Sequence, residues 1–364
     1  MGLTMTVVNA DRLRDFATTV LTRVGVPADQ AADAANVLLW ANLHGVDTHG
    51  VRNLKPFYVD RILSGRVNPK PNFHMEYETP LTGRANADSG LGLAAGCWAM
   101  RQAIAKAKDH GIGLISIRHS NHFGAAGYFA MQAVPHDMIG VALTGFMSPK
   151  GMESGVLPAN GKRPMLSTNP ISFAAPTRSA DPFLLDMATS ISPMNRVWLY
   201  KELGKVLPLG WGLDGDSQPT TDPAALRALF PLGGSLLTGG HKGYGLALVV
   251  EILCAQLSGG FGPSEEAGEE GSDEGYTQRG DAHFFAAIRV DMFRPVDEFK
   301  ESMDAMIDAL HQAEPMGDEK VIVPGEPQHA TRRARQESGV PLAPNVVEDL
   351  TTLSQTYDVP LPWD

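Results

Sequence analysis

The chain has 364 residues, 43% of them apolar and 20% charged, with a formal net charge of −11 at pH 7. Its length predicts two or three interlocked domains, and its acidic balance argues against a nucleic-acid surface, which needs clustered Lys and Arg. No apolar run reaches the roughly 18 residues of a membrane span, and both cysteines lie in apolar stretches, so a reduced, cytoplasmic compartment is expected.

The first part of the chain is predicted to be helical. Apolar residues recur at helical spacing from Leu13 to Val24, and Gly25 followed by Pro27 ends one helix and allows a second to begin. The second helix runs through AADAANVLLWANLHG, where Gly45 is a plausible C-cap. A strand-like segment, FHMEYE, and a long helix, LGLAAGCWAMRQAIAKAKDH, follow.

The middle of the chain alternates short apolar runs with Gly and Pro. GIGLISIRHSNH predicts a buried strand with a polar end, and MIGVALTGF, ISFAAPT and PFLLDMA predict further strands. GYGLALVVEILCAQLSGG is apolar around most of its circumference and predicts a buried helix. Residues 264–281 are acidic and Gly-rich and predict a solvated loop. FFAAIRVDMF predicts another strand. An apolar stripe from Phe299 to Leu310 predicts a helix, and a further helix is predicted near the C-terminus.

One glycine motif imitates a dinucleotide fingerprint. Gly90, Gly92 and Gly96 open a helix between two predicted strands. The preceding strand ends well before Gly90, however, so these glycines do not form the tight strand-to-helix turn that the fingerprint needs. We interpret them as close-packing residues, with Asp88 or Ser89 as the helix cap.

GGHKGYG indicates an anion site. It places Lys242 in the first turn of a helix, where the helix dipole disfavours a cation by about 0.3–1 kcal/mol unless an anion is present. With an anion, Lys242, the free backbone N–H groups and the close approach that Gly243 and Gly245 allow would form a phosphate site. The alternative is a solvated lysine at a fraying helix end.

Asp186 ends the predicted strand in PFLLDMATS. A carboxylate at the carboxyl end of a strand suits hydrogen bonding to ribose hydroxyls. A helix cap or turn residue is an equally good interpretation.

Two segments carry a pair of histidines each. RHSNHFG carries His119 and His122 at a strand end, where clefts form, which favours a polar active-site role for one of them. Together with His44 and His49 they could form a metal-dependent hydrolase. No HExxH spacing or cysteine pair supports that alternative, so no metal site is predicted.

GVDTHGVRNL combines a histidine and an arginine between glycines, just beyond a helix end. His49 can exchange a proton near neutral pH, and Arg52 offers a planar fork for a carboxylate. Interconversion of a 2-hydroxy acid and a 2-oxo acid requires these two groups. A surface loop with incidental charges is the alternative.

Seven segments in order resemble the malate/L-lactate dehydrogenase family of the non-Rossmann type. They are GVDTHGVRNL, GIGLISIRHSNHFGAAGY, STNPISFAAPT, DMATS, GHKGYGLALVVEILCAQLSGG, HFFAAIRVDMF and VIVPGEPQHATRRARQESGV. The similarity covers nearly the whole chain. It is specific because all seven segments occur in the order typical of the family.

The resemblance implies an α/β (α+β) fold with a mostly antiparallel sheet, surrounding helices and a bound NAD or NADP. It implies a homodimer, with His49 as proton donor and His122 in the same cleft. The expected cofactor-binding residues are Asp186, Met187, Ala188, Lys242, Gly243, Gly325, Glu326 and Pro327. The expected domains are 1–75 with 298–364 (helical), 76–190 with 280–297 (the NAD(P)-binding sheet) and 191–279 (small and irregular).

Departures from the family pattern lie on the substrate side. Relatives place an arginine four positions after the catalytic histidine, where this chain has Asn53, so the expected clamp Arg52 comes one position early. LKPFYV is one residue longer than usual before Tyr58, a second expected substrate-binding residue. Gly145 and Phe146 stand where relatives often carry Asn-Ser.

The sequence therefore predicts an NAD(P)-dependent oxidoreductase acting on a small 2-oxo acid and its (S)-2-hydroxy acid. A cyclic imine of the Δ1-piperideine-2-carboxylate type is the alternative substrate. A His-based metal hydrolase and a cofactor-binding protein without turnover are the alternatives from other classes.

Overall fold

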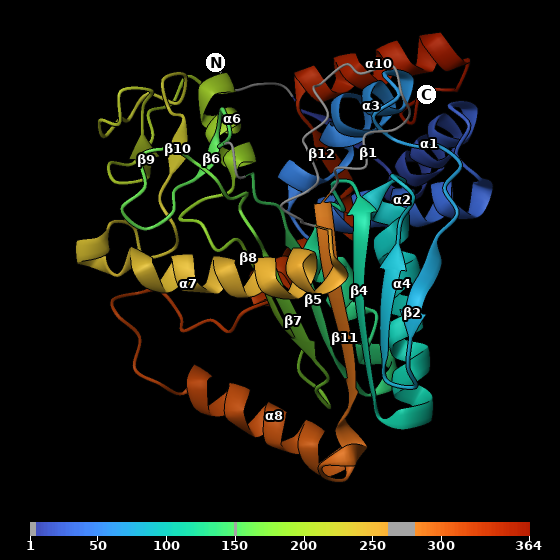
Figure 1. The fold of residues 1–364 in the computed structure, drawn as a ribbon, viewed down its shortest axis with the longest axis vertical. Helices are drawn as coiled ribbons and strands as arrows, with labels where there is room; N and C mark the ends of the chain where they lie inside the picture. The colour runs from blue at the N-terminus through green and yellow to red at the C-terminus, as the bar shows by residue number, and fades with distance from the viewer. Residues whose placement is uncertain (1–4, 149–150, 261–280) are drawn as a thin grey trace.

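The computed structural model describes residues 5–148, 151–260 and 281–364, built around a seven-stranded sheet (Figure 1). The strand order is β2-β3-β4-β11-β5-β7-β8, and within this sheet only β3 and β4 run parallel. The strands are β2 (His74–Glu78), β3 (Thr82–Asn86), β4 (Ile112–Ser120), β5 (Met138–Gly145), β7 (Ile171–Ala175), β8 (Phe183–Met187) and β11 (Asp281–Arg289). The predicted mostly antiparallel, non-Rossmann sheet is confirmed.

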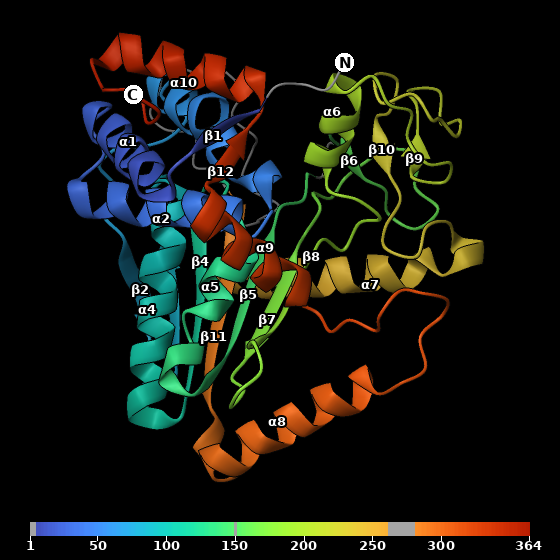
Figure 2. The same cartoon turned by 180° about the vertical axis from the view of Figure 1, so that it is seen from behind.

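Strand β11 is central because both of its faces are apolar. Phe285 and Ala287 pack under α4 (Gly92–His110) and α5 (Ala126–Met131). Phe284 and Ala286 belong to a second cluster on the opposite face, where α7 (Gly240–Glu251) continues into the π-helix η6 (Ile252–Gln256). Figures 1 and 2 show these helices on the two faces of the sheet. A strand buried on both sides has an almost unbroken apolar sequence, as here.

Gly92 and Gly96 are close-packing residues, as predicted. A Cβ on Gly92 would lie 1.8 Å from the carbonyl oxygen of Asn121, and a Cβ on Gly96 would lie 2.7 Å from the ring of Phe129. The predicted helix cap was wrong, because α4 has Leu91 at its N-cap position and no side-chain cap. The carboxylate of Asp88 is instead bonded to the 68–72 loop, which it draws against the start of α4.

Helices from both ends of the chain lie together at one end of the sheet (Figures 1 and 2). They are α1 (Ala10–Arg23), α2 (Ala28–Leu43), α3 (Asp60–Leu63), α9 (Glu326–Ser338) and α10 (Pro344–Tyr357). Strand β1 (Thr6–Val8) pairs with β12 (Val340–Leu342) and ties the two ends together. One hydrophobic cluster runs from Leu13 on α1 to Phe285 on β11, so the helices and the sheet share a core. The domain boundaries stay a prediction.

A smaller unit lies beside the amino end of α7 (Figure 1). It contains β6 (Gly155–Val156), α6 (Met194–Glu202), β9 (Gly212–Leu213) and β10 (Ala228–Leu229). Its own cluster packs Val156, Val197 and Leu229 against Ala247 of α7. Short helical turns, η4 (Val134–His136), η5 (Leu236–Thr238) and η7 (Val290–Met292), join other elements.

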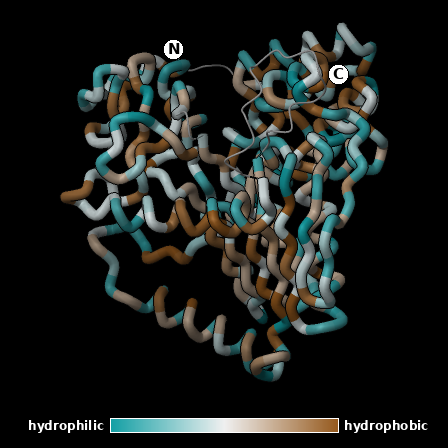
Figure 3. The backbone as a smooth tube through the Cα atoms, viewed as in Figure 1, coloured by the Kyte–Doolittle hydropathy of each residue, from teal (hydrophilic) through white to brown (hydrophobic). Residues whose placement is uncertain are grey.

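The prediction that the helix in GYGLALVVEILCAQLSGG is buried was wrong for the single chain. Figure 3 shows hydrophobic residues along α7, yet Ile252 is 57% exposed and Leu257 is 58% exposed. Only the side that carries Ala247, Val250 and Cys254 packs against the rest of the chain. The predicted acidic loop lies outside the described residues except for its last one, Asp281, which begins β11.

The last helix before the C-terminal segment is also largely uncovered. Helix α8 (Val296–His311) projects from the body of the molecule (Figure 1). Of its predicted apolar stripe only Ile307 is buried, whereas Met306 and Leu310 are exposed.

Candidate active site

The structure brings His49 and His122 together. His49 lies on the 3-10 turn η1 (Asp47–His49) just after α2, and His122 follows β4. Their ring centroids are 5.7 Å apart and the rings are nearly parallel, at 18°. The two histidines that the sequence singled out for acid/base chemistry therefore share one site.

Each of these imidazoles is oriented by a hydroxyl group. Thr48 Oγ1 lies 2.9 Å from Nδ1 of His49, and the Tyr58 hydroxyl lies 2.8 Å from Nδ1 of His122. Burial raises the pKa of Tyr58, so the phenol keeps its proton. Among the described residues, Nε2 of both rings has no hydrogen-bond partner. Each ring can therefore present Nε2 to a ligand.

Both imidazoles are neutral near pH 7. Burial lowers the pKa of His49 to about 4. The pKa of His122 is held well below its ordinary value, mainly by burial and also by the neighbouring His49 ring and the positive charge of Arg61. A neutral imidazole can accept a proton from a hydroxyl group, which is the base that oxidation of a hydroxy acid needs.

The turn that carries His49 is built on the buried carboxamide of Asn42. Its Oδ1 accepts the backbone N–H of Val51 at 2.9 Å, and its Nδ2 donates to Asp47 at 2.7 Å. Arg335 of α9 holds Asp47 from the other side, at 2.7 and 2.9 Å. Gly50 is required here because a Cβ would lie 2.2 Å from Asn42 Oδ1. The glycine after His49 thus serves a close approach.

Arg52, the expected carboxylate clamp, is engaged by another residue of the chain. Its Nη1 donates to Glu202 Oε2 at 3.0 Å, and its Nη2 contacts the other carboxylate oxygen. The neighbouring Asn53 is buried and donates to the carbonyl oxygen of Thr48 at 3.0 Å. Asn53 therefore supports the turn that carries His49.

The segment LKPFYV, which the sequence predicts to be one residue longer than usual, forms a π-helix. Residues Leu54–Val59 form η3, in which the N–H of Asp60 bonds to the carbonyl of Lys55. A π-helical turn holds one residue more than an α-helical turn and is frequent at functional sites. Here it carries Tyr58 to His122 and places the ring of Phe57 5.3 Å from the His122 ring.

Sequence reasoning missed Arg61 and Asp281 as members of this site. The guanidinium of Arg61 lies 4.8 Å from the centroid of the Phe57 ring. Burial raises the pKa of Asp281 to about 6, against the opposing effect of Arg61. Arg61 follows Tyr58 by three residues, and that helical spacing was the available signal. No sequence signal pointed to Asp281, because it is the last residue of an acidic segment that predicts a solvated loop.

Glu251 of α7 fills the space that Gly145 leaves. A Cβ on Gly145 would lie 2.8 Å from Glu251 Oε2, which accepts a hydrogen bond of 3.3 Å from Asn169. Oε1 is buried and has no partner among the described residues, and burial raises the pKa of this carboxyl to about 7. The space beside Gly145 therefore holds a buried acid.

Asp186 joins the candidate cofactor site to the histidine segment. Its Oδ2 accepts the N–H of Gly127 at 2.9 Å, in the first turn of α5, whose N-cap residue is Ala125. Gly127 is in the same short segment as His122. Burial raises the pKa of Asp186 to about 6. Oδ1 has no partner in the part of the chain that the structure describes, so a ribose role stays a prediction.

The other expected cofactor segments lie around β8, which Met187 ends and Ala188 follows. The amino end of α9 is against this strand (Figure 2): Leu184 donates to Pro324, and a Cβ on Gly325 would lie 3.0 Å from Leu184. Glu326 and Pro327 form the first turn of α9, where Glu326 accepts the N–H of Val323 at 3.0 Å.

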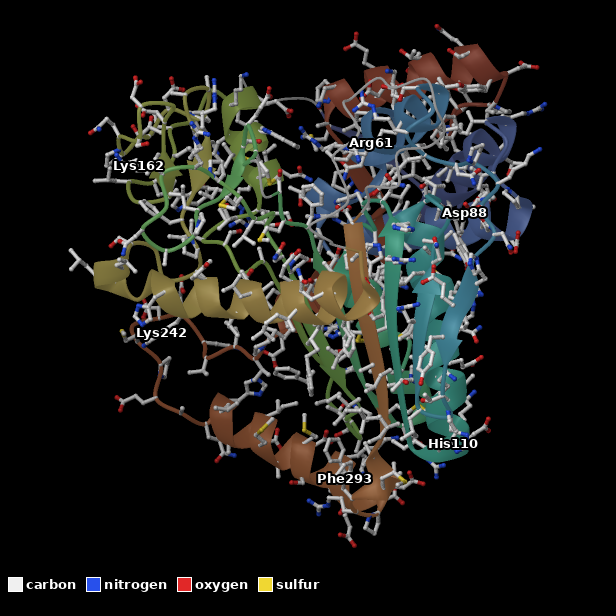
Figure 4. All side chains as sticks on the ribbon, viewed as in Figure 1. Arg61, Asp88, His110, Lys162, Lys242 and Phe293 are labelled. Carbon is white, nitrogen blue, oxygen red and sulfur yellow. The ribbon has the colours of Figure 1, made fainter. Side chains whose placement is uncertain are left out.

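Lys242 lies in the first turn of α7, whose N-cap residue, Gly239, provides no side-chain cap. Leu232 connects this turn to β8, because its N–H donates to Thr189 and its backbone packs on Gly243. Gly243 thus serves this packing, whereas nothing lies within 4 Å of a Cβ on Gly245. Lys242 is exposed, and Figure 4 shows it across the molecule from Arg61.

The four histidines of the metal-hydrolase hypothesis do not form one cluster. His44 stacks on Trp40 at 3.9 Å, and its Nδ1 is 2.8 Å from the Trp40 carbonyl oxygen. His119 is buried at the end of β4 with a positive φ of 53°. Within the described ranges, no group of three or more His, Cys, Asp or Glu residues is placed to hold a metal ion.

Comparisons with known proteins identify the family of the chain. The family model of malate/L-lactate dehydrogenase matches residues 8–351. A malate dehydrogenase of Pyrococcus horikoshii is 40% identical over 96% of this chain and 95% of its own, and an L-sulfolactate dehydrogenase of Methanocaldococcus jannaschii is 35% identical over 87% and 88%. The solved malate dehydrogenase of Entamoeba histolytica superposes with a TM-score of 0.91 at 32% identity, covering 99% of this chain and 100% of that one. The chain therefore belongs to the malate/L-lactate dehydrogenase family.

Proposed function

We propose that this protein interconverts a small 2-oxo acid and its (S)-2-hydroxy acid with NAD or NADP. The main supporting observation is the pair of neutral imidazoles, His49 and His122. In each ring Nδ1 is hydrogen-bonded to a hydroxyl group, and among the described residues Nε2 has no hydrogen-bond partner. Relatives of this chain are named malate, sulfolactate and ureidoglycolate dehydrogenases, and the names of two specify NADP(+) or NAD(+).

The residues at the site divide the work. A bound NAD(P) supplies the hydride acceptor or donor. During oxidation, Nε2 of His49 takes the proton of the substrate hydroxyl group, and during reduction the same nitrogen returns it. Thr48 holds the His49 ring, while Tyr58 holds the ring of His122, the second candidate for the proton-transfer role.

The cofactor fits three features of the chain. The amino end of α7 lacks a side-chain cap, carries Lys242 and has open space at Gly245, which suits a phosphate. Oδ1 of Asp186 is available for a ribose hydroxyl. The first turns of α7 and α9 both adjoin β8 or the residues that follow it.

Lys242→Ala should weaken NAD(P)H binding roughly tenfold, since it removes one charge-assisted contact to a phosphate. At saturating cofactor, turnover should change little, because Lys242 does not touch the substrate. Fluorescence titration of NADH and NADPH measures this effect. Lys205→Ala, at another exposed lysine, is the matched control. Equal affinities in wild type and Lys242→Ala would remove Lys242 from the cofactor site.

The activity itself is tested with a panel of 2-oxo acids and cyclic imines. Each is offered with NADH and with NADPH, and the reduced nicotinamide absorbance is followed. Turnover of a 2-oxo acid is expected. Turnover of imines alone would select the reductase alternative, and binding of NADH with no turnover would select the cofactor-binding alternative. A stoichiometric transition metal in purified protein, with hydrolytic activity, would favour the hydrolase.

We also infer a homodimer in which the uncovered side of α7 and η6 meets a second copy. Four apolar residues are exposed along it at helical spacing: Leu246, Val249, Ile252 and Leu257. Such a continuous patch marks an interaction surface, and two copies related by a two-fold axis can cover it with the same patch.

Ile252→Asp should convert a dimer into a monomer, because it would bury an unpaired carboxylate in the interface. Sedimentation velocity measures the change directly. Leu209→Asp places the same charge at another exposed leucine, away from α7, and should leave the dimer intact. A wild-type chain that sediments as a monomer would refute the homodimer.

We propose a cytoplasmic location and small-molecule partners, without nucleic acid. Cys97 and Cys254 are both buried free thiols, as a reducing compartment permits. The net charge of −11 opposes binding to a phosphate backbone. Among the residues that the structure describes, no helix has the length and apolar character needed to cross a membrane.

A further inference from the structure

We infer that Arg61, rather than Arg52, binds the carboxylate of the substrate. This inference rests on the proposed 2-oxo acid chemistry and names the residue that would recognise the acid group. The expected clamp, Arg52, is paired with Glu202, and the neighbouring Asn53 is buried and bonded to Thr48, so another cation is needed for the task.

Arg52 is poorly placed for that role. Its guanidinium forms a two-point ion pair with Glu202 of α6, and its side chain is only 19% exposed. A substrate carboxylate would have to displace both charge-assisted hydrogen bonds.

Arg61 is placed beside the histidines. Its guanidinium carbon lies 4.8 Å from the centroid of the Phe57 ring, and that ring lies 5.3 Å from the ring of His122. The positive charge of Arg61 acts on His122, Tyr58 and Asp281. Phe57 thus contacts both the cation and the His122 imidazole.

The guanidinium of Arg61 is available for a ligand. Across residues 5–148, 151–260 and 281–364, its side chain forms no ion pair and no hydrogen bond, and its contact with Phe57 is through the face of the ring. A guanidinium held over an aromatic ring keeps its N–H donors free for the two oxygens of a carboxylate. Arg61 therefore lowers the pKa of His122, and within the described residues its guanidinium N–H groups form no hydrogen bond.

The surroundings explain why an anion would need this arginine. Burial raises the pKa values of Asp281 and Glu251, so a negative charge here is costly without a cation. The negative charge of a carboxylate bound to Arg61 is neutralised by the guanidinium. The C2 oxygen of the same substrate can then point toward the imidazoles. The substrate class is a small acid with its carboxylate next to the reacting carbon.

The test compares Arg61→Gln with Arg52→Gln. Using the 2-oxo acid that the wild type reduces best and its C1 amide, we expect Arg61→Gln to lower kcat/KM for the acid by about 10- to 100-fold, the value of a charge-assisted pair. The amide should be affected little, so the acid-to-amide preference collapses. Arg61→Lys should restore part of it. A purely structural role of Arg61 would lower both substrates together.

A binding measurement keeps the inference independent of turnover. Oxamate, a small 2-oxo acid analogue, is titrated in the presence of NADH, with intrinsic tryptophan fluorescence as the readout. Arg61→Gln should weaken oxamate binding by about the same 10- to 100-fold, and Arg52→Gln should not. Unchanged binding in Arg61→Gln, or a collapsed acid-to-amide preference in Arg52→Gln, overturns the assignment. A wild type that binds oxamate but reduces no 2-oxo acid refutes only the proposed reaction.

Discussion

His49→Ala should lower kcat by about 10²–10⁴-fold, the usual contribution of a positioned acid/base group. The alanine cannot move the substrate proton, whereas Thr48, Tyr58 and the segments around β8 remain. Binding of NAD(P)H should therefore change little. Steady-state kinetics of the best substrate, with fluorescence titration of the cofactor on the same sample, separate the two effects.

His122→Ala is the matched comparison, because its ring is stacked on that of His49 at 5.7 Å. If His49 is the dominant base, His122→Ala should lose less turnover; the reverse order would move the role to His122. The pH profile gives a second check. Because burial lowers the pKa of His49 to about 4, the ring is already neutral at mildly acidic pH, and oxidation should keep its rate from about pH 8 to about pH 6. A loss of rate below an apparent pKa near 6.5 would show that the ring titrates normally.

Gly50→Ala should reduce kcat by about 10²-fold without removing any chemical group, since small displacements of a reacting group have effects of that size. The new Cβ would lie 2.2 Å from Asn42 Oδ1. The carboxamide would have to leave, breaking its bonds to Val51 and Asp47 that order the His49 turn. Unfolding in denaturant should also show a loss of about 1–3 kcal/mol.

Gly215→Ala is the control for Gly50→Ala. Nothing lies within 4 Å of a Cβ at Gly215, so the same methyl group there should be harmless to rate and stability. A Gly50→Ala variant with normal turnover would show that the turn tolerates a shifted Asn42. A variant that loses stability but keeps kcat would show that the turn does not position His49.

Much of the fold could be predicted from the sequence, because local patterns determine helices and strands. Apolar spacing gave α1, α2 and α4, and short apolar runs between Gly and Pro gave β4, β5, β7 and β8. Gly92 and Gly96 were correctly assigned to close packing. The strand in front of them, β3, was missed; it ends at Asn86, four residues before Gly90. The segment with the extra residue before Tyr58 was also found, and it is a π-helix.

The arrangement of the site was decided by contacts between distant segments. The sequence named His49 and His122, but their approach depends on the end of α2 meeting the end of β4. The engagement of Arg52 by Glu202 and the position of Arg61 over Phe57 were hidden, since an ion pair or a ring contact depends on separation in space. The exposed side of α7 was missed for a related reason: its apolar residues predict burial, and whether this chain or a second copy covers them is a property of tertiary and quaternary packing. Periodicity and turn chemistry act over a few residues and can be recognised in one chain, whereas the pairing of remote side chains is settled only when the backbone has folded around them.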